Sequence, residues 1–408
     1  MRILISAYAC EPHKGSEPGI GWNWVREIAR FNEVWVITRE NNRPAIEAAA
    51  RADGLGNVHW NFFDLPRWSR FWKKGHRGVH LYYYLWQLAG HSVARRLASQ
   101  VKFDLAHHVT FGQYWMPSLI ARLGIPFILG PLGGGESAPT SFTRAMEWPG
   151  WGFERTRELV RGSAELNPRV RSAIRRAALC LASTAQTADR LRDLGCRRVR
   201  IHSCCGLPEE DIAALAAVPQ RHSAPFRMFS GGALYGWKGF HLGLLAFARF
   251  QASGPPGEYW IFGDGPQRRP LEKQAQQLGV ADRVRFLGAV PRARLLDELA
   301  SCDLLVHPSL HDSGGWICAE AMAAGRPVIC LDLGGPALQV TEETGIKIAA
   351  DDPQRAVASI AEAMRTLALN PELRIAMGET ARRRIRDEFA WRRKGEALAG
   401  FYREAVAQ

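Results

Sequence analysis

No stretch of this 408-residue chain carries the roughly 18 uncharged apolar residues that a membrane-spanning helix requires. The eight cysteines form no Cys-x-x-Cys pair, and Cys204 and Cys205 are adjacent, so the sequence indicates neither a zinc knuckle nor a disulfide framework. The opening residues, MRILISAY, form too short an apolar run for a signal-peptide core. These absences favour a cytoplasmic protein with reduced thiols.

Acidic residues are scarce in the first half of the chain only. Residues 1–206 contain 29 Lys and Arg against 16 Asp and Glu, a net charge of +13, whereas residues 207–408 contain 24 of each. One-sided positive charge favours attraction to an anionic membrane surface or to nucleic acid. A solvated basic face without a partner explains the same charge, and nucleic acid is the more distant interpretation.

Short apolar runs alternate with longer amphipathic stretches in both halves, which predicts βα units and two parallel sheets. The length also exceeds what one hydrophobic core usually supports, so we expect two domains. Strands are expected in both halves at 3–8, 34–38, 126–129, 226–230, 258–262, 284–287, 304–307 and 327–331. Helices are expected between them at 22–30, 82–100, 240–251, 270–278, 293–300 and 318–324.

We expect an N-terminal domain at 1–206, a polar linker at 208–225, and a second domain at 207–385. A basic helix ends the chain, with a break near Phe389 and Trp391, and its part from 386 to 408 is expected to cross back to the first domain. Because open parallel sheets bind ligands beyond the carboxyl ends of their strands, the residues that follow each strand are the informative ones.

The strongest signal is residues 307–330, HPSLHDSGGWICAEAMAAGRPVIC. A strand ends at His307, a glycine-rich turn offers backbone N–H groups, and a helix begins near Ile317, which together suit anionic oxygens. Asp312 on the turn and Glu320 on the helix are carboxylates that can accept hydrogen bonds from vicinal hydroxyls.

Three further turns follow predicted strands of the second half. Residues 231–240, GGALYGWKGF, place Lys238 after a glycine-rich turn, a position where a lone lysine is usually a surface residue. Residues 261–266, IFGDGP, and 284–290, VRFLGAV, end two more strands.

The first half carries glycine turns and a histidine pair. Residues 14–24, KGSEPGIGWNW, are neither a full dinucleotide fingerprint nor a phosphate-binding Walker loop. Residues 103–112, FDLAHHVTFG, end a strand in His107 and His108, of which strand alternation permits only one to face a given side. Without further context, a strand histidine is more often a satisfied core residue than a ligand-facing one. Residues 130–136, GPLGGGE, either leave backbone amides accessible to a ligand or form a flexible loop without a binding role.

Together these segments resemble glycosyltransferase family 4, whose members have the GT-B architecture: two Rossmann-like α/β domains that face each other across a cleft. The resemblance covers most of the chain and is most specific at 226–345. Two departures are Asp312 where the family has the first Glu of its Glu-x7-Glu pair, and Ala233 where the family has an arginine. The resemblance implies a retaining transfer of a hexosyl group from a nucleoside-diphosphate sugar, without a cofactor or an obligatory metal.

The resemblance also assigns roles to residues of this chain. It implies catalytic roles for Lys238, Asp312 and one of the two histidines, His107 or His108. It implies donor contacts at Gly19, Gly21, Gly265, Val290, Gly314, Gly315, Trp316, Ile317 and Glu320, and acceptor-side positions at Gly133, Gly134 and Glu136. The acceptor would be a glycan or a lipid-linked saccharide in polysaccharide or glycoconjugate biosynthesis.

Basic and aromatic residues interleave between Trp60 and Trp86. Such a segment suits the inner face of the cytoplasmic membrane as a peripheral contact, the stacking of nucleobases, or the stacking of acceptor sugars. A buried helix accounts for part of the aromatic content.

Two other functions fit the same architecture. A sugar-nucleotide 2-epimerase would need no acceptor, and a non-catalytic partner subunit would show no turnover. The substitutions at Ala233 and Asp312 motivate the second of these alternatives.

Overall fold

The computed structural model describes residues 1–69, 71–72, 78–145, 150–220 and 225–407. Its internal contacts divide the chain into two units. The first unit comprises Met1–Gly135, Leu159–Cys204 and Trp391–Gln408, and the second comprises Glu136–Glu158 and Cys205–Ala390. The segment 136–158, which the sequence analysis assigned to the first domain, therefore packs with the second unit.

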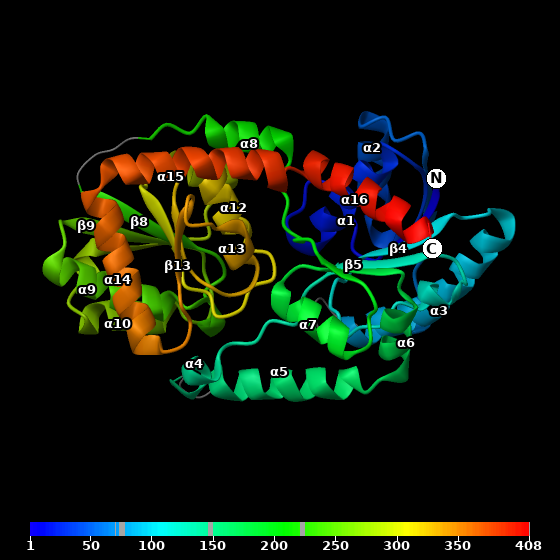
Figure 1. The fold of residues 1–408 in the computed structure, drawn as a ribbon, viewed down its shortest axis with the longest axis horizontal. Helices are drawn as coiled ribbons and strands as arrows, with labels where there is room; N and C mark the ends of the chain where they lie inside the picture. Colours follow the sequence, from blue (N-terminus) through cyan, green and yellow to red (C-terminus); the bar gives the residue numbers. More distant parts are fainter. Residues whose placement is uncertain (70, 73–77, 146–149, 221–224, 408) are drawn as a thin grey trace. The chain divides into compact units, whose positions relative to one another are not determined.

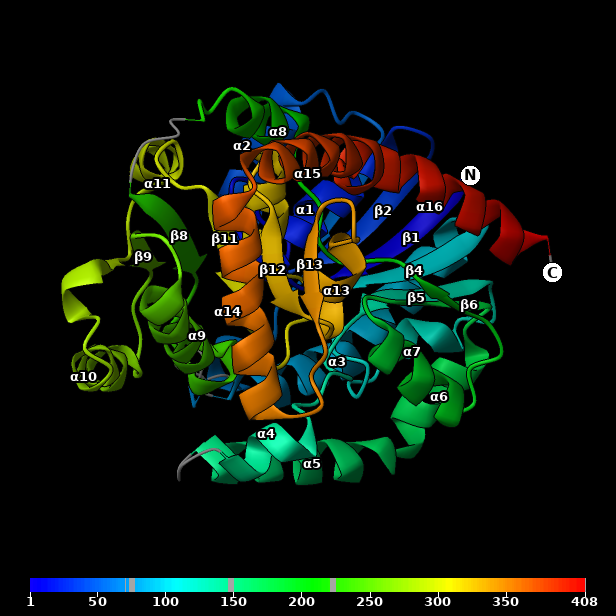
Figure 2. The ribbon, with the colours of Figure 1, turned by 60° about the vertical axis from the view of Figure 1, so that its left-hand side comes forward.

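The first unit is built on a sheet of seven parallel strands. In space their order is β3-β2-β1-β4-β5-β6-β7, and Figure 2 labels the middle five, from β2 to β6. The strands are β1 (Arg2–Ala7), β2 (Glu33–Thr38), β3 (Val58–Phe62), β4 (Leu105–Thr110), β5 (Phe127–Leu132), β6 (Leu179–Ala182) and β7 (Val199–Ile201). Both β4 and β5 are buried at every residue, and β5 reads as the continuous apolar run expected of a strand covered on both faces, whereas β4 includes the two histidines.

Helices cover both faces of this sheet. Two of them, α1 (Ser16–Ala29) and α16 (Trp391–Val406), pack against each other and against β4 on one face. On the other face, the core that includes Leu4 and Ala106 is closed by α3 (Val79–Gln100), α6 (Pro168–Arg176) and α7 (Ala185–Asp193). A further helix, α2 (Arg43–Ala52), lies between β2 and β3 in the chain.

The second unit holds six parallel strands in the order β10-β9-β8-β11-β12-β13. Figure 1 labels three of them, β8, β9 and β13. These are β8 (Phe226–Gly231), β9 (Gly257–Phe262), β10 (Val284–Gly288), β11 (Leu304–His307), β12 (Val328–Leu331) and β13 (Gly345–Ile348). The strand order reverses between β8 and β11, which is the position where open α/β sheets bind ligands.

Two apolar cores flank the second sheet. One core contains side chains of α4 (Thr140–Ala145), α9 (Phe240–Ser253), α10 (Arg268–Gln277) and α14 (Pro353–Leu369). The other contains side chains of α8 (Glu209–Ala216), α11 (Arg292–Leu299), α12 (Trp316–Ala323) and α15 (Pro371–Arg384). The remaining helices are α13 (Gly334–Gln339) and α5 (Gly150–Glu165), and the unit division falls within α5 after Glu158.

The expected elements of the second unit are confirmed, and β11 has the expected bounds of 304–307. The break expected near Phe389 is also confirmed: α15 runs into a π-helical turn at Ile385–Phe389, and Ala390 is extended before α16 begins. The expectation that 208–225 is only a linker is wrong, because α8 forms there and buries Ile212 and Leu215.

Within the residues that the structure describes, no helix combines the length and the apolar composition needed to span a bilayer. The basic-aromatic segment is described only in part, since Arg70, Lys73, Lys74 and Arg77 lie outside the described residues. In the described part, Trp68 and Phe71 are 79% and 78% exposed, whereas Trp86 is buried in the core of the first unit.

Candidate active site

Two loops of the second unit meet where its strand order reverses. One loop follows β8 and ends in a single 3₁₀ turn at Gly236–Lys238, and the other follows β11 from Pro308 to Gly315. The Leu310 N–H donates to the Trp237 carbonyl at 2.8 Å. A Cβ on Gly239 would lie 1.9 Å from the Pro308 carbonyl oxygen, and Gly239 has φ +71°, so only glycine permits this approach.

The paired loops bring Lys238 and Asp312 together. The Lys238 ammonium Nζ lies 2.5 Å from Asp312 Oδ2, and His307 Nε2 lies 3.4 Å from the same oxygen. Burial raises the pKa of the Asp312 carboxyl, but the interactions with His307 and Lys238 outweigh burial and hold that pKa below its ordinary value. Burial lowers the pKa of His307. The site therefore presents an ionised carboxylate paired with an ammonium group.

Asp312 also organises the glycine turn that follows it. Its Oδ1 accepts hydrogen bonds from the backbone N–H groups of Gly314 and Gly315, both at 3.1 Å. We expected this turn to offer unoccupied N–H groups to a ligand. That expectation is wrong for Gly314 and Gly315, because the Asp312 carboxylate already accepts from both of their N–H groups. In the first turn of α12, which begins at Trp316, the Cys318 N–H donates to the Gly315 carbonyl at 2.9 Å, so the N–H groups of Trp316 and Ile317 are the ones that the helix itself leaves without a partner.

Other expected donor residues of the second unit gather around the same loops. Ile317, at the start of α12, packs against Gly231, where a Cβ would approach its side chain to 3.1 Å. Gly265 packs against the Leu234 backbone, since a Cβ there would lie 2.8 Å from the Leu234 nitrogen. Glu320 is half-buried one turn further along α12. Val290 is half-buried against the α12-side core.

The histidine pair of the first unit lies in that unit's core. His107 Nδ1 is 2.7 Å from the Tyr402 hydroxyl on α16, and its Nε2 is 2.7 Å from the Gly130 carbonyl oxygen. His108 points to the opposite face, where its Nε2 lies 3.3 Å from the Tyr83 hydroxyl. Both side chains are buried, because helices cover both faces of β4.

Burial lowers the pKa of His107 to about 3 and that of His108 to about 4. A neutral His107 can donate from Nε2 to Gly130 while its Nδ1 accepts from Tyr402, so both ring nitrogens are used within the unit. This placement corrects the catalytic expectation for His107, which instead fixes α16 to β4 and β5. His108 remains a candidate only as a buried neutral side chain.

The expected glycine positions of the first unit serve close packing. A Cβ on Gly19 would lie 1.9 Å from the Lys14 carbonyl oxygen, and one on Gly21 would lie 2.0 Å from that of Ala9. The Gly133 N–H was expected to be accessible. That expectation is wrong, because this N–H donates to the Gly112 carbonyl. Gly134 has φ +87°.

Glu136 does not lie in the first unit, to which the sequence analysis assigned it. It packs with the second unit, is 2% exposed, and accepts a hydrogen bond from the Ser313 hydroxyl at 2.6 Å. The expectation of an acceptor-side Glu136 followed from its position after the glycine run, whereas the unit boundary falls between Gly135 and Glu136.

These two parallel α/β units, with the terminal helix packed on the first, define the GT-B fold. Sucrose-phosphate synthase from Thermosynechococcus elongatus matches 100% of this chain and 99% of its own, with a TM-score of 0.61 and 18% identity. Anabaena HepE in complex with UDP matches 98% of this chain and 99% of its own, with a TM-score of 0.61 and 18% identity.

Residues 214–384, which lie within the second unit, match the family model described as glycosyl transferases group 1. Among curated proteins, the D-inositol 3-phosphate glycosyltransferase of Corynebacterium glutamicum is 35% identical over 146 residues. That match covers 35% of this chain and 34% of the relative, so the chain matches about a third of that relative's length.

Proposed function

We propose that the chain is a retaining glycosyltransferase that moves a hexosyl group from a nucleoside-diphosphate sugar to a hydroxyl of a glycan or lipid-linked acceptor. The observation that carries this proposal is the contact between Lys238 and Asp312 where the strand order of the second sheet reverses. The group 1 domain at 214–384 and the UDP bound to a structural neighbour support it.

In this proposal the donor diphosphate lies against Lys238 and the N-terminal end of α12, where ammonium charge and backbone N–H groups stabilise the negative charge of the leaving group. Glu320 accepts hydrogen bonds from the ribose diol, and Asp312 accepts them from sugar hydroxyls. The bond between the anomeric carbon and the phosphate oxygen breaks, and a bond from that carbon to the acceptor oxygen forms on the same face. The acceptor proton passes to the departing phosphate.

The pairing of Lys238 with Asp312 fits this role. The pair holds the ammonium group beside the turn that leads into α12, since Asp312 also accepts from the Gly314 and Gly315 amides. A fixed ammonium requires little reorganisation when a diphosphate arrives, which is the condition under which electrostatic stabilisation is most effective.

A thermal-shift panel of UDP, GDP, ADP and dTDP tests the donor site. One of the four is expected to raise the melting temperature of the wild-type chain, because a ligand at 100 times its Kd stabilises the folded state by about 2.7 kcal/mol. Glu320→Ala should lose this shift, while Glu362→Ala, an exposed carboxylate on α14 paired with Arg365, should keep it. The absence of a shift with all four would contradict the proposal.

We also propose that the basic first unit contacts an anionic membrane surface through Trp68 and Phe71. Both rings are exposed, and the sequence of this segment interleaves aromatic with basic residues, a composition that suits the headgroup region of a bilayer. A Trp68→Ser/Phe71→Ser double variant is expected to lose sedimentation with phosphatidylglycerol vesicles, and Phe31→Ser, half-exposed elsewhere in the unit, should retain it. Equal sedimentation of the double variant would overturn this contact.

A further inference from the structure

One part of the second unit comes from the first half of the sequence. Residues 136–145 and 150–158, here called the strap, pack with the second unit although about fifty residues separate them from Cys205, where the rest of that unit begins. Phe142 of α4 is 2% exposed and belongs to the apolar core that contains α9 and α14. The strap is therefore an integral part of the second unit.

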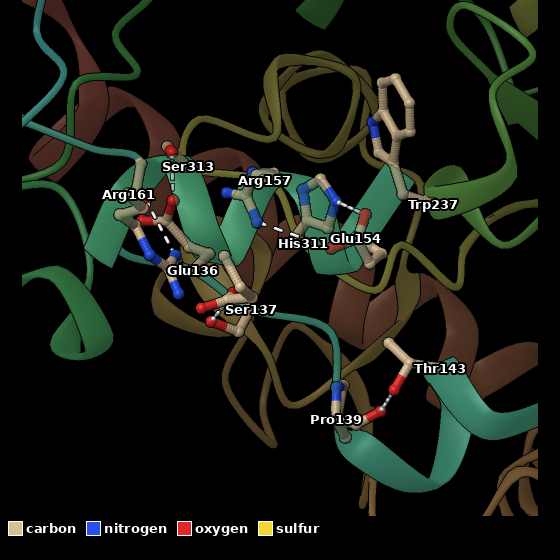
Figure 3. Close-up of polar contacts among 12 residues, drawn as sticks. Glu136, Ser137, Pro139, Thr143, Glu154, Arg157, Arg161, Trp237, His311 and Ser313 are labelled. Atoms are coloured by element: carbon tan, nitrogen blue, oxygen red, sulfur yellow. Dashed lines mark hydrogen bonds and ion pairs between the residues drawn. The ribbon is translucent and has the colours of Figure 1, made fainter. Parts of the chain in front are cut away.

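The α5 part of the strap lies against the two loops of the candidate site (Figure 3). The Phe153 ring stacks on the Trp237 ring with 5.0 Å between centroids and an angle of 13° between planes. Glu154 Oε1 lies 2.8 Å from His311 Nε2, within hydrogen-bonding distance. The rings of Trp237 and His311 stack on each other with centroids 5.6 Å apart, so the two contacts form one cluster.

The strap contacts residues that are adjacent in sequence to Lys238 and Asp312, the two charged residues of the site. Trp237 directly precedes Lys238, and His311 directly precedes Asp312. Ser313, directly after Asp312, donates to Glu136 at the start of the strap. Side chains adjacent in sequence to Lys238 and Asp312 are thus held by residues that lie more than 70 positions away.

The burial of Glu154 favours a defined geometry. Its side chain is 5% exposed, and its carboxylate contacts His311 on one side and Arg157 Nη1, at 3.6 Å, on the other. A buried carboxylate is costly to leave without partners, so this arrangement restricts where the His311 backbone can lie. Phe153, in contrast, is 48% exposed, so its ring contributes little to the core of the unit.

We propose that Phe153 and Glu154 are positioning residues for the donor site: they hold Trp237 and His311, and through the backbone they set the distance between Lys238 and Asp312. This inference rests on the proposed function. It adds that the donor site is complete only with the strap, because the loops after β8 and β11 are supported from a segment outside the group 1 domain at 214–384.

Calorimetric titration tests the inference with whichever of UDP, GDP, ADP and dTDP binds the wild-type chain. Phe153→Ala is expected to weaken that Kd about three- to tenfold, the factor that corresponds to the usual strength of an aromatic pair. Phe153→Tyr keeps the ring and should bind within about twofold of wild type, since stacking is retained. Arg155→Ala is the control on the same helix. It removes a guanidinium group that lies over the Trp151 ring, and this variant should bind the nucleoside diphosphate as tightly as the wild-type chain does.

A matched pair at Glu154 keeps the inference testable if an aromatic variant folds poorly. Glu154→Gln retains an oxygen that can accept from His311, whereas Glu154→Ala does not, so only the alanine variant should weaken binding. The melting temperature of ligand-free Phe153→Ala should change little, because its ring is half-exposed.

The outcomes separate the two ideas. If the wild-type chain binds a nucleoside diphosphate and both alanine variants bind it equally well, the strap inference is overturned while the proposed function stands. If no nucleoside diphosphate binds the wild-type chain, the proposed function is overturned, and the inference with it.

Discussion

Lys238→Ala is expected to lower kcat for donor turnover by about 10² to 10³, the usual loss when one group that stabilises a developing negative charge is removed. The ammonium group lies 2.5 Å from Asp312 and at the approach to α12, so its removal takes away the side-chain charge placed to balance a leaving diphosphate. The release of nucleoside diphosphate, followed over time with purified protein, measures this loss.

The same substitution should change the pH dependence of turnover. Lys238 lowers the pKa of Asp312, so that in the wild-type chain this carboxyl stays ionised below its ordinary pKa of 3.8. Without the ammonium group, only His307 still opposes the rise that burial causes in the pKa of Asp312, so the carboxyl should take up a proton at a higher pH than in the wild-type chain. The acid limb of the rate profile should therefore move to higher pH in Lys238→Ala.

Two controls separate charge from folding. Lys238→Arg keeps the charge but changes its shape, so it should retain more activity than Lys238→Ala. Lys347→Ala removes a lysine of the same unit that pairs with Asp332 near the surface, and its kcat should equal that of wild type. A kcat for Lys238→Ala within about threefold of the wild-type value would mean that this lysine does not stabilise the leaving group.

The parallel strands and the paired loops could be predicted from the sequence because their signals are local. The run at 304–307 is apolar and ends at His307, and the glycine turns follow directly, so periodicity and turn chemistry suffice. The break in the terminal helix near Phe389 could also be predicted from the residues at that position alone.

The strap could not be predicted because its contacts join distant residues. The Glu154–His311 contact spans 157 positions, and the Glu136–Ser313 hydrogen bond spans 177. No periodicity within 136–158 indicates which sheet the segment covers. Trp237 and His311 stand directly before Lys238 and Asp312, and that adjacency was the available signal for their role.

The burial of His107 and the occupied amides of Gly314 and Gly315 have a different cause. A histidine at the end of a strand looks the same in the sequence whether it faces a ligand or a helix, and here α16 supplies Tyr402 from the other end of the chain. Likewise, a carboxylate before a glycine turn can bind a ligand or the turn itself, and Asp312 binds the turn.

The second large expected effect is the turnover of the donor itself. Donor turnover can be measured without the acceptor, because water can take the acceptor's place. A site that stabilises the leaving diphosphate also promotes slow hydrolysis of the donor. Hydrolysis must produce one nucleoside diphosphate and one free sugar for each donor consumed. A retaining reaction must release that sugar first in the anomeric configuration of the donor.

Proton NMR of the wild-type chain with the UDP-, GDP-, ADP- and dTDP-linked forms of glucose and mannose tests the central claim most directly. For one donor, we expect nucleoside diphosphate and free sugar to appear in equal amounts, the anomeric configuration to be retained at early times, and Lys238→Ala to slow both. Conversion of the donor to a 2-epimer with its diphosphate intact, or no change in any donor, would contradict the claim.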